Sequence, residues 1–316
     1  MKKLIFYFLL IICFQSINAQ YTEIINSKRP GLSESPYSVG TNVYQFESGF
    51  FYRSSDNESL LAYPNSYGSN LFFRYGKFRE KLEFNANIAY RIDEVKNPLG
   101  ENFHKNGLSN LTVGLKYLVY QQEFTDKSKE VRSMKRRMAF DWKRLIPSVG
   151  VYAGVNTNFI SKEYKSDEGI SYKGAILLQN DITDRLVVLT NLYTDKYSSE
   201  EKYYGHIITM TFAMNQLWSF FIENDGKYKD GFSPSFQFGS GLAYLFSNDL
   251  QIDLSARTNF FDDYSYYTFS AGFAWRLDRH RDSYTITNAP SKTKNTKKRK
   301  GFFKRLFGKK NRKKRI

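Results

Sequence analysis

The chain has 316 residues, of which 47 are Lys or Arg and 31 are Asp or Glu, and its only cysteine is Cys13. Fourteen basic residues lie within residues 292–316 and two more are Lys2 and Lys3, so the 31 that remain equal the acidic residues of the body. A neutral body argues against a nucleic-acid-binding domain. A body without cysteine excludes disulfides and thiolate metal sites.

The N-terminal residues are typical of a secretory signal peptide. Two lysines at positions 2 and 3 precede an apolar run over residues 4–14, and Ala19 stands before a polar residue. We expect cleavage after Ala19, which makes 1–19 the signal peptide of an exported protein. The apolar run is shorter than the roughly 20 residues of a membrane-spanning helix. A short N-terminal membrane anchor is the alternative.

Residues 20–40 are expected to form a periplasmic lead-in. Its part from residue 29 to 39 contains two prolines and four hydroxyl side chains, so a regular strand is not expected there. Two interpretations stay open. The segment folds into the mouth of the following domain as a small plug, with Arg29 and Glu34 binding charges of its wall, or it is an ordinary extended lead-in.

Alternation with a period of two dominates residues 41–278. In residues 81–92 the apolar side chains occupy every second position, and Lys81, Glu83, Asn85, Asn87 and Arg91 lie between them. Such a run gives a strand one apolar and one polar face. We predict twelve strands, at residues 41–53, 69–77, 80–92, 109–120, 145–157, 172–181, 185–194, 203–214, 217–224, 234–246, 249–260 and 267–277.

An all-β fold follows, a transmembrane antiparallel up-and-down barrel of about twelve strands. Short and long connections alternate along the chain, as they do in outer-membrane barrels with short periplasmic turns. Phe and Tyr gather near the predicted strand ends, where a bilayer has its interfaces. We therefore expect an outer-membrane location with both termini in the periplasm. A soluble periplasmic sandwich or lipocalin-like barrel is the alternative.

Charged residues at the polar parity of the predicted strands should face the lumen. They are Glu47, Arg53, Arg74, Lys81, Glu83, Arg91, Lys116, Glu223, Asp253, Arg257 and Arg276. They either line an open polar path or pair with one another and fill the interior.

Two basic additions stand out from the barrel body. The insertion 121–144 carries Lys135, Arg136 and Arg137 in the place of a short periplasmic turn. In the tail 279–316, apolar residues alternate with cations. The tail residues suited to a membrane surface or a periplasmic protein partner are Phe302, Phe303, Lys304, Arg305 and Phe307. A largely disordered, solvated tail is the alternative.

Catalytic, metal and cofactor motifs are missing from the sequence. The twelve-stranded outer-membrane phospholipase architecture places a serine two positions after a strand histidine, whereas His206 is followed at that position by Ile208. The nucleophile of that enzyme class is therefore lacking. We expect no enzyme activity, no cofactor and no metal.

Several stretches resemble the MetA-pathway phenol-degradation family of outer-membrane proteins. They are Lys28 to Val39 (KRPGLSESPYSV), Tyr44 to Gly49, Phe73 to Gly76, Asn110 to Tyr117 and Phe273 to Leu277. The resemblance covers residues 28–278 and implies a barrel that moves small, apolar or aromatic compounds across the outer membrane. The first functional hypothesis is therefore passive transport. The second is a non-conducting subunit of a larger envelope assembly, which uses the basic insertion and tail to bind partners.

Overall fold

The computed structural model describes residues 24–55, 64–95, 102–124, 133–134, 140–165, 169–259 and 265–280. In these residues the alternating segments form strands, because side chains at successive positions point to opposite faces. The strands are β1 (Val43–Ser55), β2 (Asn65–Gly76), β3 (Leu82–Val95), β4 (Phe103–Tyr120), β5 (Ser148–Asn156), β6 (Ser171–Asp181), β7 (Leu186–Asp195), β8 (Tyr203–Ala213), β9 (Trp218–Lys229), β10 (Ser235–Ser247), β11 (Leu250–Asn259) and β12 (Tyr266–Asp278).

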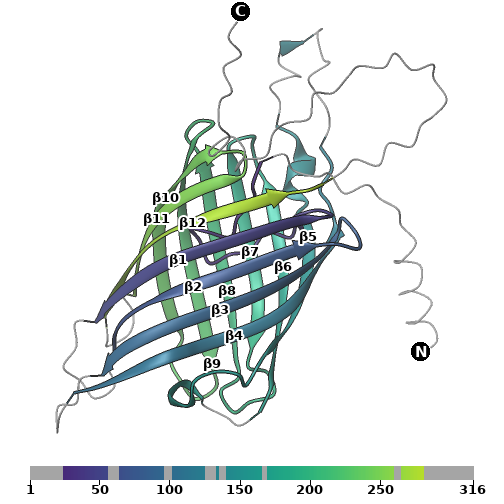
Figure 1. Cartoon of the computed structure of the whole chain (residues 1–316). Coiled ribbons are helices and arrows are strands. Elements are labelled where there is room, and N and C mark those ends of the chain that lie inside the picture. Colours follow the sequence, from purple (N-terminus) through teal and green to yellow (C-terminus); the bar gives the residue numbers. More distant parts are fainter. Residues whose placement is uncertain are drawn as a thin grey trace, which may run out of the picture. The chain divides into compact units, whose positions relative to one another are not determined.

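Each strand pairs antiparallel with its neighbours in sequence, and β1 pairs with β12 to close a barrel of twelve strands (Figure 1). The predicted fold class is confirmed. The predicted bounds were too short by four to six residues in three places, because β2 begins at Asn65, β4 begins at Phe103 and β9 continues to Lys229. The missed residues are mainly polar, and backbone pairing continues through them without an apolar face.

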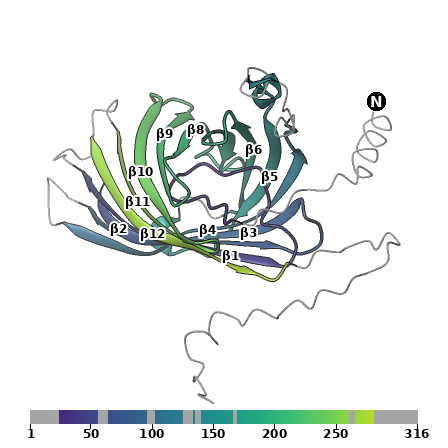
Figure 2. The same ribbon diagram turned by 90° about the horizontal axis from the view of Figure 1, so that it is seen from above.

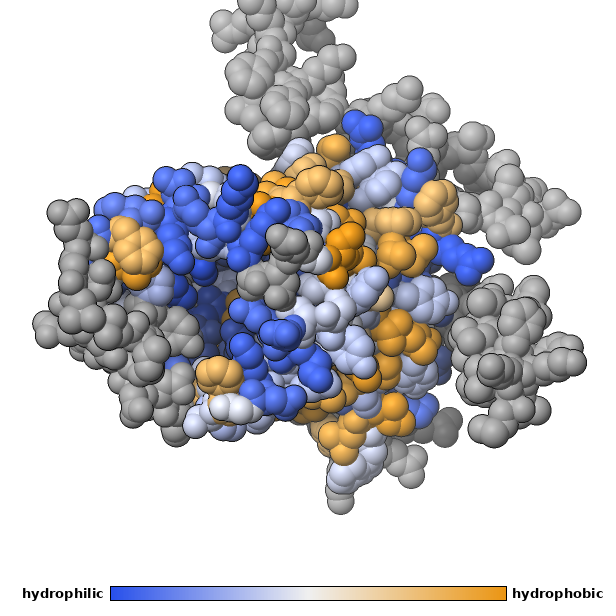
Figure 3. Space-filling model, turned by 90° about the horizontal axis from the view of Figure 1, so that it is seen from below, coloured by the Kyte–Doolittle hydropathy of each residue, from blue (hydrophilic) through white to orange (hydrophobic). Residues whose placement is uncertain are grey.

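Burial in the barrel is the reverse of that in a soluble protein. On β11, Ile252 and Leu254 are 47% and 61% exposed, whereas Asp253 between them is 2% exposed. Apolar side chains cover the outer wall, and hydrophilic ones surround a recess at one mouth (Figure 3). An apolar exterior around a polar interior suits lipid rather than water, which favours the membrane barrel over the soluble alternatives.

The two ends of the barrel differ in their connections. One end holds the start of β1, the end of β12 and the short connections 77–81, 182–185, 214–217 and 248–249; we call it the turn end. The other end, the loop end, includes the 3-10 helix η2 (Lys162–Tyr164). The connection from β4 to β5 also lies at the turn end and contains η1 (Trp142–Leu145). Among the described residues, no helix is long and apolar enough to cross a membrane.

Residues 24–42, here called the inserted segment, lie inside the ring of strands (Figure 2). They contain no regular secondary structure before β1. Ile25 is anchored near the turn end, where its backbone N–H donates to the Asn248 carbonyl at 2.8 Å. The segment therefore occupies the lumen before the chain enters the wall at Val43.

Several predicted features fall outside the described residues. These are the signal peptide 1–19, the tail beyond residue 280, and the surface residues Lys135, Arg136, Arg137, Phe302, Phe303, Lys304, Arg305 and Phe307. Their predicted roles stay predictions.

Candidate functional site

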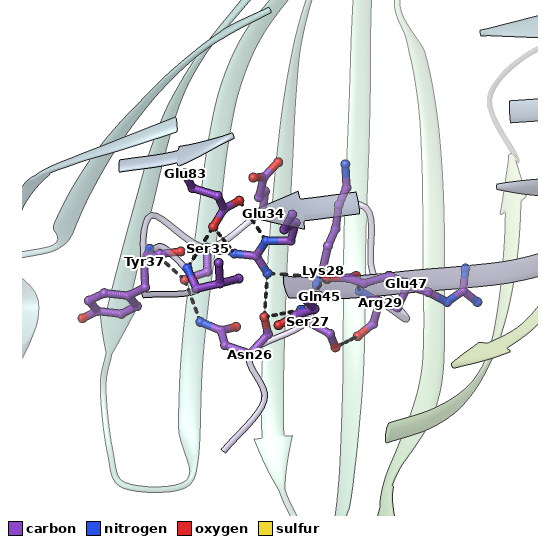
Figure 4. Close-up of polar contacts among 12 residues, drawn as sticks. Asn26, Ser27, Lys28, Arg29, Glu34, Ser35, Tyr37, Gln45, Glu47 and Glu83 are labelled. Atoms are coloured by element: carbon purple, nitrogen blue, oxygen red, sulfur yellow. Dashed lines mark hydrogen bonds and ion pairs between the residues drawn. The ribbon is translucent and has the colours of Figure 1, made fainter. Parts of the chain in front are cut away.

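Arg74 on β2 joins the barrel wall to the inserted segment. Its side chain is almost fully buried, and its Nε and Nη2 donate to the two carboxylate oxygens of Glu83 on β3 at 2.8 and 2.9 Å. Its Nη1 donates to the Asn26 carbonyl at 2.6 Å (Figure 4). This bidentate, charge-assisted geometry is strong and directional, so one wall residue holds both a neighbouring strand and the inserted backbone.

Glu47 on β1 accepts from the inserted backbone. Its Oε2 accepts the N–H groups of Lys28 and Arg29 at 3.0 and 3.1 Å, and its Oε1 lies 3.4 Å from Arg74 Nη1. Backbone amides that leave water need an acceptor, and this buried carboxylate supplies it. The segment is thereby fixed at its first turn.

Lys116 on β4 holds the middle of the inserted segment. Its Nζ lies 3.2 Å from carboxylate oxygens of both Glu34 and Glu83, and it donates to the Ser35 carbonyl at 3.1 Å. Glu83 also accepts from the Val39 N–H at 3.0 Å. Wall charges from β1 to β4 therefore grip the segment along most of its length.

A second set of contacts comes from β9, β11 and β12. Arg29 binds Asp253 through two bonds of 3.1 and 2.7 Å, and reaches Ser270 at 3.1 Å. Glu223 accepts from the Leu32 N–H at 2.7 Å, and Arg257 donates to the Pro30 carbonyl at 2.6 Å. Both sets pair buried charges with each other or with backbone groups.

Contacts toward β5 and β6 are fewer and uncharged. Ser35 donates to Gln179 at 2.7 Å, and the Tyr37 hydroxyl lies 2.7 Å from the Ser148 hydroxyl. The inserted segment is thus tied by ion pairs on one side and only by neutral hydrogen bonds on the other.

Three cavities lie along the lumen on the weakly tied side. A turn-end cavity of about 1200 Å³, a central cavity of about 210 Å³ and a loop-end cavity of about 620 Å³ succeed one another. The first two share Lys28 in their lining, and the last two share Lys173 and Tyr203. These shared side chains therefore mark the two boundaries between the three cavities.

The central cavity has aromatic walls and a charged rim. Phe72, Tyr152, Tyr193 and Tyr203 line it together with Lys28 of the inserted segment. The Tyr193 and Tyr203 hydroxyls donate to Asp225 and Asp195 at 3.1 and 3.3 Å. The Tyr152 ring lies over the glycines at 114 and 154, where a Cβ atom would come within 2.4 Å of its hydroxyl oxygen. Wall glycines therefore make room for this ring.

Burial shifts the two charged groups of the inserted segment that face the central cavity. For Lys28, burial outweighs the attraction of Glu34 and lowers the pKa of the ammonium. For Glu34, burial opposes ionisation, but Lys116, Lys28 and Arg74 outweigh it and lower the pKa of the carboxyl. The segment therefore keeps its carboxylate charged, while its lysine bears an unrelieved cost of desolvation.

Most predicted lumen residues lie on the inner face of the wall. Those that are buried there are Glu47, Arg74, Glu83, Lys116, Glu223, Asp253, Arg257 and Arg276. Arg53 and Arg91 lie near the loop end, where Arg53 donates to Ser66 at 2.7 Å and Arg91 pairs with Asp93 at 2.9 Å. The strand position predicted for Lys81 is corrected, since it lies in the turn before β3.

Several lumen residues were not predicted. They are Asp93, Lys173, Asp195, Asp225 and Lys227. Lys173 pairs with Asp195 at 3.1 Å and Lys227 with Asp225 at 3.5 Å, while Asp93 pairs with Arg91. All except Lys173 lie beyond the predicted strand ends, so continuing the same alternation would have found them. Lys173 lies within a predicted strand, at the polar parity.

Groups suited to metal binding or catalysis do not gather in the described part of the chain. No cluster of three or more His, Asp or Glu there could hold a metal ion. His206 lies beside two aromatic rings, with ring centroids 5.8 Å from Tyr228 and 6.4 Å from Phe236, and its Nε2 is 3.0 Å from Asn224. This is the setting expected of an amphipathic residue in an aromatic belt.

Solved structures with similar folds include outer-membrane channels. An outer membrane channel from Pseudomonas putida F1 has a TM-score of 0.52 at 8% identity, covering 80% of this chain and all of that one. The NanC porin has a TM-score of 0.47 at 13% identity, covering 74% and 100%. The CymD monoaromatic hydrocarbon channel has a TM-score of 0.41 at 9% identity, covering 76% and 90%. At these identities the likeness concerns the fold alone, and the first structure supports it.

A search of curated proteins gave no match. The model of a protein family described as "Putative MetA-pathway of phenol degradation" matches residues 27–277. This range includes the inserted segment from residue 27 onward and all twelve strands except the last residue of β12. The resemblance seen in the sequence is confirmed, and the chain belongs to this family of outer-membrane barrel proteins.

Proposed function

We propose that the chain is a passive outer-membrane conduit for small molecules, which pass between the inserted segment and strands β5 to β8. The observation that carries the proposal is the succession of three cavities on that side, which share lining residues at their boundaries. On the opposite side, the ion pairs of Arg29 with Asp253 and of Glu34 with Lys116 join the segment to the wall. In this function the inserted segment is a plug that narrows the lumen without filling it.

The turn end is proposed to face the periplasm, because both termini of the barrel meet there and its connections are mostly short. The solute class we propose is small and apolar or aromatic. The aromatic lining of the central cavity supports this, since such rings bury apolar surface while their polar edges stay hydrogen-bonded. The family description points the same way.

Liposome swelling with the refolded full-length chain tests the proposal. Ala175 on β6 lines the central cavity, whereas Ala256 on β11 is exposed on the outer wall. Ala175→Trp should abolish uptake of a one-ring solute, while the control Ala256→Trp should leave it unchanged. Equal uptake by both variants would refute a route through the central cavity.

The second candidate is a structural subunit of an envelope assembly. An aromatic pair at the turn end favours it, because Phe140 and Trp142 contact edge to face at 5.5 Å while Trp142 is 76% exposed. Exposed aromatic residues of this kind are common at interfaces. A stoichiometric partner that co-purifies with the chain, and is lost on deletion of residues 281–316 or on Trp142→Ser, would support this role. A barrel that purifies alone and conducts would contradict it.

A further inference from the structure

Lys28 differs from the other cations around the central cavity. Lys116, Lys173 and Lys227 each lie within 3.5 Å of a carboxylate oxygen. In the described part of the chain, no acceptor lies within ion-pair or hydrogen-bond distance of Lys28 Nζ, which lies over the Phe72 ring at 5.1 Å from its centroid. Figure 4 shows the Lys28 side chain pointing away from the network that binds its backbone.

Hydrogen bonds on Lys28 and on the next residue hold the backbone from which this side chain extends. The Lys28 N–H donates to Glu47 at 3.0 Å, and the next residue is held by Asp253 through two bonds. A half-buried ammonium with unused donors carries a desolvation cost that an acceptor would offset. Because the backbone is anchored on both sides, the acceptor has to come to the ammonium from the cavity.

The cavity around Lys28 limits what can supply that acceptor. Its volume of about 210 Å³ is below the roughly 300–1,000 Å³ of sites for drug-sized ligands, so it suits a one-ring molecule. Phe72 and Tyr152 line the cavity with aromatic rings against which a ligand ring can pack. The Tyr152 hydroxyl has no hydrogen-bond partner among the described residues. A carboxylate accepts from an ammonium and a phenol at once.

We propose that the central cavity is a binding site for a small aromatic carboxylate, with the carboxylate on Lys28 and Tyr152 and the ring between Phe72 and the cavity wall. This inference rests on the proposed conduit function, because it names the solute that would pause at the first of these boundaries. The site also explains why Lys28 is held at the boundary between two cavities.

Calorimetric titration of the refolded full-length barrel with sodium benzoate tests the site. Benzyl alcohol is the uncharged comparison, and it should bind more weakly than benzoate. Lys28→Met should weaken benzoate binding by about tenfold to a hundredfold, the usual worth of a charge-assisted hydrogen bond. Lys77→Met is the matched control, since Lys77 is exposed in the turn after β2, and it should bind benzoate as the unaltered chain does.

Two further measurements keep the outcomes separate. Lys28→Arg retains a cation and should retain most of the binding, and heat-dependent mobility in gels reports whether each variant is a folded barrel. Failure of the unaltered chain to bind benzoate, or equal binding by a folded Lys28→Met barrel, would overturn the proposed site. Swelling of liposomes without benzoate binding refutes the site and spares the conduit; benzoate binding without swelling refutes the conduit and spares the site.

Discussion

The two sides of the lumen hold the inserted segment in different ways. Toward β1 to β4, Arg74 and Lys116 join Glu34, Glu47 and Glu83 in a network with side chains that are at most one-tenth exposed. Toward β5 to β8, Ser35 and Tyr37 make neutral hydrogen bonds to the wall, and cavities lie beside these contacts.

The two sides of the wall therefore serve different purposes: one holds the inserted segment and the other leaves space beside it. Removing one member of a buried ion pair is costly, because it leaves a charge without partner or water, so the network fixes the segment. A cavity side with few fixed contacts leaves room for a solute. An interior with paired charges of both signs can therefore be filled on one side and open to a solute on the other. The sequence offered two interpretations of these charges, an open polar path or a filled interior, and neither of them alone describes this arrangement.

Removing the segment should have the largest effect. Replacing residues 26–37 by a Gly/Ser linker of equal length removes the side-chain contacts of this stretch on both sides, so the bore of the barrel should open. We expect single-channel conductance in planar bilayers to rise severalfold over that of the unaltered chain. An equally folded barrel with unchanged conductance would show that the segment does not restrict the lumen.

Breaking the ionic side should come next. Arg74→Met leaves Glu47 and Glu83 buried without their shared cation, which should destabilise the seated segment by about 3–5 kcal/mol. A reporter thiol at Ser33, which is 2% exposed, would follow this in a chain that also carries Cys13→Ser. Maleimide labelling should be much faster in the Arg74→Met barrel. Adding Glu47→Gln should restore part of the protection, because Glu47 loses its ion-pair partner in Arg74→Met, whereas Glu83 keeps Lys116 at 3.2 Å.

How far the sequence predicts this arrangement depends on which groups make the contacts. Alternation predicts the strands, and it predicts that the side chains of Arg74 and Asp253 face the lumen. Both predictions depend only on the two-residue period of side chains along a strand. The path of the inserted segment has no such signal, since Glu47 and Glu223 accept from its backbone N–H groups. Every residue type except proline offers that donor. Arg29 and Glu34 were identified as possible anchors by charge, whereas the role of Lys28 appears only from its lack of a partner.

A smaller effect is expected at the second ionic anchor. Asp253→Asn keeps the size of the side chain but removes the charge that accepts both bonds from Arg29. The loss should be about 1–3 kcal/mol, because an amide oxygen can still accept one bond. Labelling at Ser33 should accelerate less than in Arg74→Met. If labelling were as fast as in Arg74→Met, the contacts on β11, rather than those on β2, would be the main ones that hold the segment.

The smallest effect should come from the cavity side. Lys173 lies 3.1 Å from Asp195, and its side chain is 31% exposed. In Lys173→Gln, Asp195 keeps bonds from Asn156 at 2.7 Å and from the Lys196 N–H at 2.8 Å, so no carboxylate is left unsatisfied. A partly exposed pair contributes about 0–1 kcal/mol, and Ser33 labelling should match that of the parent within error. Lys173 makes no contact with the inserted segment in the described network. Fast labelling in this variant would therefore mean that a change on the cavity side weakens the contacts on the ionic side. A solute moving past Lys173 could then loosen the segment itself.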